Sequence, residues 1–261
     1  MGTFSEISCS SPDRAKASEA MDEAFREMVR IESLFSKHDK LSEVSKINRI
    51  AGREEVRLSS ETFNIIERSI YYSRISDGSF DITVEPLKKG RYKDVVLNKD
   101  RSSIRFLAED IKVDLGGIVK GYAVDRAKEI LSSHGIENAL VDIGGNIFAL
   151  GSTSGKKDWR IGIRDPGDEN NMIYKLDLKN KAVSTSGDYE RPSHIVDPLN
   201  GQPVTKEILS VTVVADSAEK ADALSTAIFV MGAERGLRFA KSIKDIEVFI
   251  FDKDLSLLTY P

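Results

Sequence analysis

The stretch from 112 to 151 constrains the fold of this chain more than any other part of the sequence. A short extended run is broken by Gly116-Gly117, and apolar residues then recur at helical spacing from Ile118 onward. An apolar run follows over 139–143, and a second glycine pair, Gly144-Gly145, leads into another apolar run. The order strand, turn, helix, strand, turn, strand predicts the centre of a domain that combines helices with a sheet.

The first glycine pair has the features of a phosphate-binding turn. Glycine lets a backbone approach a ligand closely, and N–H groups at a helix start attract anions. Asp114 and Lys120 flank the turn and place one acceptor and one cation beside it. The turn matches neither a Walker loop nor the G-x-G-x-x-G dinucleotide fingerprint. A tight strand-to-helix turn without a ligand therefore explains the glycines equally well.

The composition describes a soluble globular protein. The chain has 261 residues, of which 40% are hydrophobic and 31% charged, so one large domain or two small ones are expected. A net charge of −4 without a basic tail argues against nucleic acid as a partner. No apolar run approaches the roughly 18 residues of a membrane helix, and no signal peptide is expected at Met1. Cys9 is the only cysteine, so an intrachain disulfide is excluded.

Hydrophobic periodicity predicts further helices and strands on both sides of the central stretch. Helices are expected over 18–35, 60–76 and 218–231, the last capped by Ser217. The segment 36–48 is polar and turn-rich, and 79–87 is expected to be extended. The mixed order favours an α+β fold over a doubly wound sheet. Strands are expected over 4–9, 159–163, 174–178, 182–186, 194–196, 210–215 and 246–251, with a hairpin formed by 95–97 and 103–106.

Asp222 and Thr226 lie four residues apart in a predicted helix and therefore share one face. A carboxylate and a hydroxyl on one face supply oxygen ligands for a hard cation such as Mg²⁺. An exposed aspartate beside a threonine that bonds its own helix is the alternative, and the pattern alone favours it.

His194 is one of three histidines and precedes the turn signal Asp197-Pro198. A histidine with an ordinary pKa near ~6.5 suits a general base at neutral pH, although a lone histidine is more often structural. Asp81 and Thr83 alternate with apolar residues, so they would share one face of a half-buried strand.

Seven stretches together resemble one family, the FAD:protein FMN transferases of the ApbE type, once called thiamine biosynthesis lipoproteins. They occur in the family's order and span nearly the whole chain. The resemblance implies an α+β, tunnelling-fold-like architecture in which a mixed, largely antiparallel sheet packs with helices. It also implies a single domain over 1–261, with two subdomains as an alternative. The matching stretches are Met1-Gly2-Thr3, FSKHDKLSEVSKIN (35–48), GSFDITVEPL (78–87), DLGGIVKGYAVD (114–125), GGN (144–146), HIVDPLNG (194–201) and DALST (222–226).

The resemblance also assigns site residues, because each lies in one of the matching stretches. His194 would be the catalytic base. The Gly117 carbonyl, Asp222 and Thr226 would bind Mg²⁺. His38 departs from the family, which usually has a tyrosine beside the flavin. Gly117 is often alanine in the family, a change that a backbone carbonyl tolerates. The residues expected to bind FAD are Met1, His38, Ser79, Phe80, Asp81, Asp114, Lys120 and Val196.

The implied reaction is transfer of FMN from FAD to a threonine or serine hydroxyl of a target protein. A phosphoester bond forms, AMP leaves, and Mg²⁺ is required. The implied partners are FAD and a flavoprotein such as a redox-complex subunit. A Mg²⁺-dependent FAD pyrophosphatase and a non-catalytic flavin-binding protein are the alternatives, and His38 keeps the first of them open. The family is usually exported, so the resemblance implies a periplasmic or membrane-anchored lipoprotein in full-length form, with a cytoplasmic location as the alternative. Contact with a membrane is expected only through an N-terminal lipid anchor.

Overall fold

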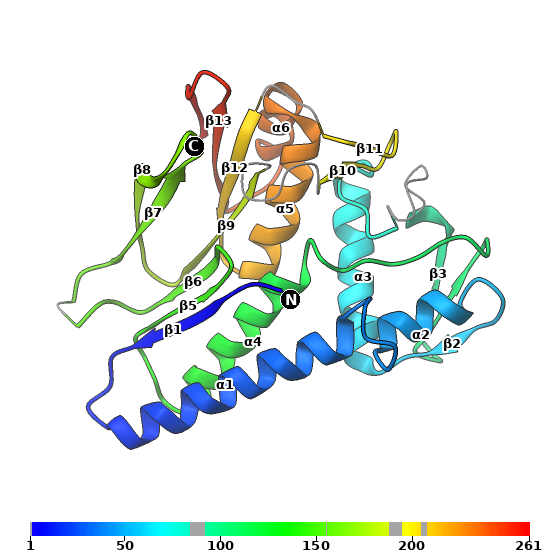
Figure 1. Ribbon diagram of the computed structural model, residues 1–261, viewed down its shortest axis with the longest axis horizontal. Coiled ribbons are helices and arrows are strands. Elements are labelled where there is room, and N and C mark those ends of the chain that lie inside the picture. Colours follow the sequence, from blue (N-terminus) through cyan, green and yellow to red (C-terminus); the bar gives the residue numbers. More distant parts are fainter. Residues whose placement is uncertain (1, 84–91, 155, 188–194, 205–207) are drawn as a thin grey trace.

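The computed structural model describes residues 2–83, 92–154, 156–187, 195–204 and 208–261. In this part of the chain the centre is a sheet of seven strands, in the order β1-β5-β6-β9-β12-β13-β14 (Figure 1). All neighbouring strands are antiparallel. The expected α+β fold with a largely antiparallel sheet is therefore confirmed. The strands are β1 (Ser5–Cys9), β5 (Ala139–Ile143), β6 (Asn146–Leu150), β9 (Lys181–Gly187), β12 (Ile208–Ala215), β13 (Glu247–Asp252) and β14 (Leu257–Tyr260).

Two helices cover one face of this sheet. The helix α4 (Val119–Ser133) packs on β5 and β6, and α5 (Ala218–Met231) packs on β9 and β12. The long helix α1 (Arg14–Phe35) lies across α4, while α6 (Ala233–Ala240) packs against α5, β13 and β14. Because α4 and α5 also contact each other, residues near their N-terminal turns come close together.

A separate hairpin covers the other face of the sheet. Its strands β7 (Trp159–Asp165) and β8 (Asp168–Leu178) pair with each other in an antiparallel ladder. Residues of β13 alternate between the two layers, as strand geometry requires. Val248 lies in the apolar cluster with α5, whereas Phe249 lies in the cluster with the hairpin. The sheet is thus buried on both faces.

A second group of elements surrounds α3 (Ser60–Ile75), beside the ends of α1 and α4 (Figure 1). A small antiparallel sheet in the order β2-β4-β3 belongs to it, and it shares one apolar cluster with α1 and α4. A two-stranded ladder joins β10 and β11. The remaining elements are α2 (Glu43–Ile50), β2 (Val56–Arg57), the 3₁₀ helix at Tyr92–Asp94, β3 (Val95–Asn98), β4 (Ser103–Phe106), β10 (Val196–Asp197) and β11 (Gln202–Pro203).

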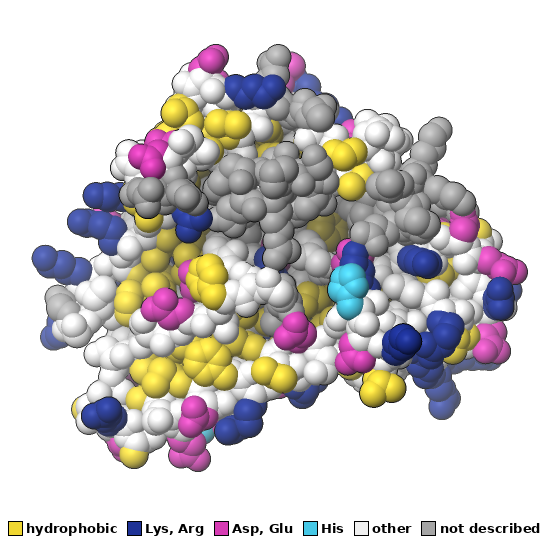
Figure 2. Space-filling view, viewed as in Figure 1, with side chains coloured by type: hydrophobic (Ala, Val, Ile, Leu, Met, Phe, Trp, Pro, Cys, Tyr) yellow, Lys and Arg dark blue, Asp and Glu magenta, His cyan; other side chains and the backbone are white. Residues whose placement is uncertain are grey.

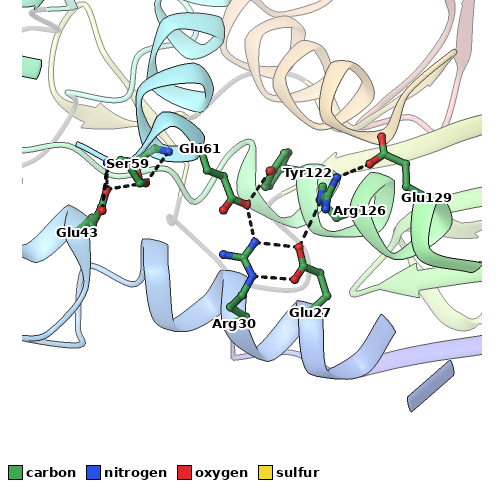
Figure 3. A network of polar contacts seen from close by, with 9 residues as sticks. Glu27, Arg30, Glu43, Ser59, Glu61, Tyr122, Arg126 and Glu129 are labelled. Atoms are coloured by element: carbon green, nitrogen blue, oxygen red, sulfur yellow. Dashed lines mark hydrogen bonds and ion pairs between the residues drawn. The ribbon is translucent and has the colours of Figure 1, made fainter. Parts of the chain in front are cut away.

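Ion pairs and hydrogen bonds tie α1, α3 and α4 together (Figure 3). Arg30 of α1 lies 2.7 Å from Glu27 and 2.7 Å from Glu61 of α3. Tyr122 of α4 donates a hydrogen bond to Glu61 at 2.7 Å, and Arg126 lies 3.3 Å from Glu27. Hydrogen bonds from Arg30 lower the pKa of Glu27, so this carboxylate is charged at neutral pH. The network fixes the three helices relative to one another.

Several expectations from the sequence are wrong. Residues 79–83 form turns instead of a strand, because the Asp81 carboxylate accepts hydrogen bonds at 2.7 Å from the N–H and the hydroxyl of Thr83. These local bonds compete with a strand ladder. The segment 36–48 contains the start of α2, which Ser42 caps. The helix α6, which follows α5, and the strand β14, which pairs with β13 at the edge of the sheet, were not expected from the sequence.

The extended run at 112–114 forms no strand, because the N–H and carbonyl of Val113 bond the Asn48 side chain instead of a neighbouring strand. The remaining predicted elements among the described residues are confirmed, with ends displaced by up to six residues. The helix α1 begins four residues earlier than expected, because Asp13 accepts a hydrogen bond from the Lys16 N–H and caps it. Of the predicted strand 194–196, Val196 lies in β10 and His194 lies outside the described residues, as do 84–87. Searching the described residues finds no helix long and apolar enough to cross a membrane.

Candidate active site

A cleft of about 1370 Å³ opens between the helix layer, the β7–β8 hairpin and the turn after α3. It exceeds the roughly 300–1,000 Å³ typical of pockets for drug-sized ligands, so it has room for a dinucleotide. In the face shown in Figure 2, Lys and Arg side chains gather along the left edge of the molecule, on the side where Figure 1 draws the β7–β8 hairpin. Ten predicted site residues line the cleft: His38, Ser79, Phe80, Asp81, Asp114, Gly117, Lys120, Val196, Asp222 and Thr226.

The first glycine turn forms part of the cleft wall. The Asp114 carboxylate accepts a hydrogen bond at 2.8 Å from the Gly116 N–H, which holds the turn. Its second oxygen lies 2.7 Å from the ammonium of Lys37. Lys37 lies directly before His38 in the sequence, but no local signal links it to an aspartate 77 residues away. Sequence reasoning therefore missed Lys37 as a cation of this site.

The Asp222 carboxylate is buried at the contact between α4 and α5. Its side chain is 4% exposed, and it accepts a hydrogen bond at 3.0 Å from the Gly121 N–H. The Lys120 ammonium lies 3.4 Å from its other oxygen. The helix α4 has no side-chain cap at its own N-cap, Ile118, so Asp222 satisfies one of the free N–H groups of its first turn. The alternative of an exposed aspartate is therefore wrong.

Close backbone packing brings these two helices together. A Cβ on Gly121 would lie 2.2 Å from the Ala218 carbonyl oxygen, so only glycine fits this contact. Asp125, one turn further along α4, accepts hydrogen bonds at 2.9 Å from the N–H groups of Ala218 and Glu219 in the first turn of α5. Each helix thus receives a capping carboxylate from the other helix.

Thr226 faces the glycine turn. A Cβ on Gly117 would lie 3.5 Å from the Thr226 hydroxyl oxygen, which places the Gly117 backbone beside this side chain. The same Cβ would lie 3.2 Å from the ring of Phe80, so an alanine at 117 would require a small shift of that ring. Asp222, Thr226 and the Gly117 backbone, which the resemblance linked to Mg²⁺, therefore lie together in the structure.

The turn after α3 contributes one buried hydroxyl without a partner. Ser79 lines the cleft, and its oxygen has no hydrogen-bond partner among the described residues. A buried polar atom without a partner is costly, so a ligand atom would stabilise it. Asp81 differs, because one oxygen accepts from Thr83 and the other from the Tyr92 N–H at 3.2 Å. Burial raises the pKa of Asp81 and these hydrogen bonds oppose the rise, so its carboxylate holds the turn.

Two of the predicted residues, Met1 and His194, lie outside the described residues. The donor set of the remaining candidates fits Mg²⁺, because all the atoms are oxygens and one of them is a buried carboxylate. The described residues contain no cluster of three or more His, Cys, Asp or Glu side chains suited to a metal. A metal here would therefore need oxygens from a ligand to complete its coordination.

The antiparallel sheet, the paired helices and the cleft define an α+β protein whose cleft is large enough for a dinucleotide. The model of the ApbE family matches residues 1–90 and 87–250, and this chain belongs to the ApbE family. The predicted family and fold are both confirmed.

Relatives of known sequence agree with this assignment. A protein of Vibrio cholerae is 32% identical over 93% of this chain and 82% of its own length. A protein of Klebsiella pneumoniae is 29% identical over 99% of this chain and 89% of its own length. Both are named FAD:protein FMN transferase.

Solved structures of the family share the whole fold. The ApbE protein of Thermotoga maritima has a TM-score of 0.89 at 33% identity, over 98% of this chain and 93% of its own. The flavin transferase ApbE of Vibrio cholerae has a TM-score of 0.87 at 28% identity, over 100% of this chain and 94% of its own.

Proposed function

We propose that this protein transfers FMN from FAD to a threonine or serine hydroxyl of a target protein and releases AMP. The observation that carries the proposal is the convergence of Lys120, Asp222 and Thr226 at one wall of a cleft large enough for a dinucleotide. The names of the relatives support the same reaction.

Two lysines would bind the pyrophosphate of FAD. Lys120 and Lys37 both line the cleft, and each lies within 3.4 Å of a carboxylate that holds it there. Charge-assisted hydrogen bonds from such ammonium groups to phosphate oxygens are stronger than neutral ones. The hydroxyl of Ser79 gives the nucleotide one further polar contact in the cleft.

We propose that Asp222, Thr226 and the Gly117 carbonyl hold Mg²⁺. A bound Mg²⁺ would neutralise charge that develops on the phosphate oxygens during transfer. Because Asp222 is the one carboxylate in this set, phosphate oxygens of FAD would complete the coordination. Metal and FAD would then bind cooperatively, each raising the affinity of the other by the same factor.

The transfer step exchanges the phosphoanhydride link of FAD for a phosphoester link to the acceptor. The acceptor hydroxyl attacks the phosphorus of the FMN half, a new P–O bond forms, and the P–O bond to AMP breaks. Most of the rate enhancement in such reactions comes from positioning and charge stabilisation, which the lysines supply. By the family resemblance, His194 would take the proton of the acceptor hydroxyl.

Incubation of the protein with FAD, Mg²⁺ and a candidate threonine-containing target peptide tests this proposal. The expected products are AMP, measured by chromatography, and the flavinylated peptide, measured by mass spectrometry. Intact FAD with no flavinylated peptide would contradict the proposal and indicate a flavin-binding protein.

A second candidate function is FAD hydrolysis. The side chain at position 38, where the family usually has tyrosine, is histidine and lines the cleft. A smaller ring beside the flavin leaves more room for water, so free FMN and AMP without a modified peptide would favour a pyrophosphatase.

The resemblance further supports an exported or membrane-anchored location for the full-length protein and a flavoprotein of a redox complex as the target.

A further inference from the structure

A chain of buried hydroxyl groups leads from Thr226 into the core. The Thr226 hydroxyl oxygen lies 3.3 Å from that of Ser186, and the Ser186 oxygen lies 2.9 Å from that of Ser225. The Ser225 oxygen lies 3.3 Å from that of Ser184, which donates to the Asn146 amide oxygen at 2.7 Å. Four of these five residues are buried, and Thr226 faces the cleft.

The sheet register places these groups in a row. Asn146 of β6 lies opposite Ser184 of β9, and Ser186 lies two residues further along β9, so both serines project from the same face. That face packs against α5, which carries Ser225 and Thr226. Because the row is enclosed by the sheet and the helix, its hydrogen bonds act in a low dielectric and are strongly directional.

A count of protons that starts from the bond of Ser225 to its own helix gives the direction of these hydrogen bonds. A serine or threonine hydroxyl has one proton to donate. The amide nitrogen of Asn146 donates to the Ile143 carbonyl at 3.5 Å, so its oxygen faces Ser184 and accepts the Ser184 proton. The Ser225 hydroxyl donates to the backbone carbonyl of Asp222, one turn earlier in the same helix, at 3.1 Å. Both protons are thus assigned to acceptors other than Ser186, and the 3.3 Å contact between Ser184 and Ser225 carries no proton. The hydrogen-bonded chain therefore runs from Thr226 through Ser186 and Ser225 to the backbone carbonyl of Asp222.

The rest of the chain follows from those two assignments. Since Ser225 has used its proton, the 2.9 Å contact with Ser186 requires the proton of Ser186. Ser186 then has none left, so Thr226 donates in the 3.3 Å contact between them. The Thr226 oxygen keeps both lone pairs, and it lines the cleft. A neutral hydroxyl binds a cation through a lone pair, so this polarity suits a metal ligand.

We propose that Ser186 and Ser225 are positioning residues that orient the Thr226 hydroxyl as an oxygen ligand for Mg²⁺, an inference that rests on the metal site of the proposed function. Ser186 accepts the Thr226 proton. Ser225 takes up the Ser186 proton and so prevents Ser186 from donating toward Thr226. Partners of metal ligands act in this way when they fix the orientation of a ligand atom.

The test is calorimetric titration of Mg²⁺ into the protein with FAD present and no acceptor, corrected for the same titration into FAD alone. Ser186→Ala should lower the Mg²⁺ affinity by roughly 10–100-fold, because Thr226 loses its acceptor. Ser186→Thr should retain the native affinity, because it keeps the hydroxyl. Ser225→Ala should also lower the affinity, because the Ser186 proton then turns toward Thr226.

Ser210→Ala is the matched control. Ser210 lies on the neighbouring strand β12, is fully buried, and its oxygen has no partner among the described residues. Removal of its hydroxyl should leave the Mg²⁺ affinity unchanged, because a buried serine with a purely structural role does not orient Thr226.

Two results would overturn the inference. Native Mg²⁺ affinity in Ser186→Ala would refute the positioning role of Ser186 and Ser225 but would not contradict the metal site. No Mg²⁺ binding by the native protein with FAD present would overturn the metal site and the chain together. Thermal unfolding of each variant shows whether a lost affinity merely reflects a lost fold. A Ser186→Ala variant that unfolds like the native protein but binds Mg²⁺ more weakly supports the proposal.

Discussion

The Asp222 carboxylate in α5 accepts a hydrogen bond at 3.0 Å from the backbone N–H of Gly121 in α4. The relationship is reciprocal, because the Asp125 carboxylate in α4 accepts from two N–H groups in the first turn of α5. A carboxylate near a helix N-terminus is stabilised by the free N–H groups and the helix dipole. The contact that holds two helices together therefore also fixes a candidate metal ligand.

Substitution Gly121→Ala should destabilise the fold and weaken FAD binding. The added methyl group would overlap the Ala218 carbonyl, forcing α4 and α5 apart. Overpacking of this kind costs about 1–3 kcal/mol of unfolding free energy. Urea unfolding measures the loss. The exposed substitution Ser132→Ala at the far end of α4 should stay within about 0.5 kcal/mol of the native protein, and equal stability of the two variants would contradict the close contact.

The stability contributed by Asp125 should depend on pH. Burial raises the pKa of Asp125 from 3.8 to about 6, so between these values the folded protein keeps a proton that the unfolded chain has lost. The contribution of Asp125 to the unfolding free energy is therefore complete below pH ~3.8. It decreases by about 3 kcal/mol in total as the pH rises to ~6. Urea unfolding from pH 4 to 7 should show this decrease in the native protein and a shallower dependence in Asp125→Asn. The same pH dependence of the unfolding free energy in the native protein and in Asp125→Asn would refute the prediction.

Substitution Asp222→Asn should separate metal binding from folding. The asparagine oxygen can still accept from the Gly121 N–H, so the unfolding free energy should change little. The negative charge is lost, so the coupling between Mg²⁺ and FAD should disappear. By contrast, Asp222→Ala should also cost about 1–3 kcal/mol of stability, because a buried N–H loses its partner. Calorimetry with and without FAD reports the coupling, and unchanged coupling in Asp222→Asn would exclude this residue as a ligand.

Substitution Lys120→Ala should weaken FAD binding by about 1.5–3 kcal/mol, because one charge-assisted contact to phosphate is removed. Titration followed by flavin fluorescence measures the affinity. Lys46→Ala, on the exposed side of α2, is the control and should bind FAD as the native protein does. Equal affinity in the Lys120 and Lys46 variants would remove Lys120 from the site.

Substitution His194→Ala should lower turnover by roughly 10²–10⁴-fold while FAD still binds, if His194 takes the acceptor proton. In the native protein, activity should rise as the pH passes the histidine pKa, near ~6.5 when unperturbed. Steady-state rates from pH 5 to 9 test both statements. Full activity of the variant at pH 7 would assign the proton to another group.

The local elements were predictable because their signals lie close together in the sequence. The apolar spacing after Gly117 indicates α4, and Ser217 caps α5 as expected. The strands and the tight turn at Gly144 follow from alternating apolar residues and a glycine with φ of +56°. The motifs of the family also identified ten residues of the cleft, since each motif is a short run in the chain.

The segment 79–83 shows where local reasoning failed. Its alternating apolar residues indicate a strand, but the Asp81 side chain bonds the backbone two residues later and bends the chain. An aspartate can either project from a strand or form such a turn, and periodicity does not distinguish the two. The preference for an exposed Asp222 failed for a similar reason, since burial depends on what packs against the helix.

The sequence by itself determined most of the helices and strands, the family and the chemical types of the site residues. The tertiary structure alone decided which of these residues meet. Lys37 pairs with Asp114 across 77 residues, and Asp222 meets Gly121 across 101 residues. The first contact forms where α1, which packs on α4, ends near the turn before α4, and the second arises from the packing of α4 against α5. No local pattern encodes them, because periodicity and caps report interactions only between residues a few positions apart.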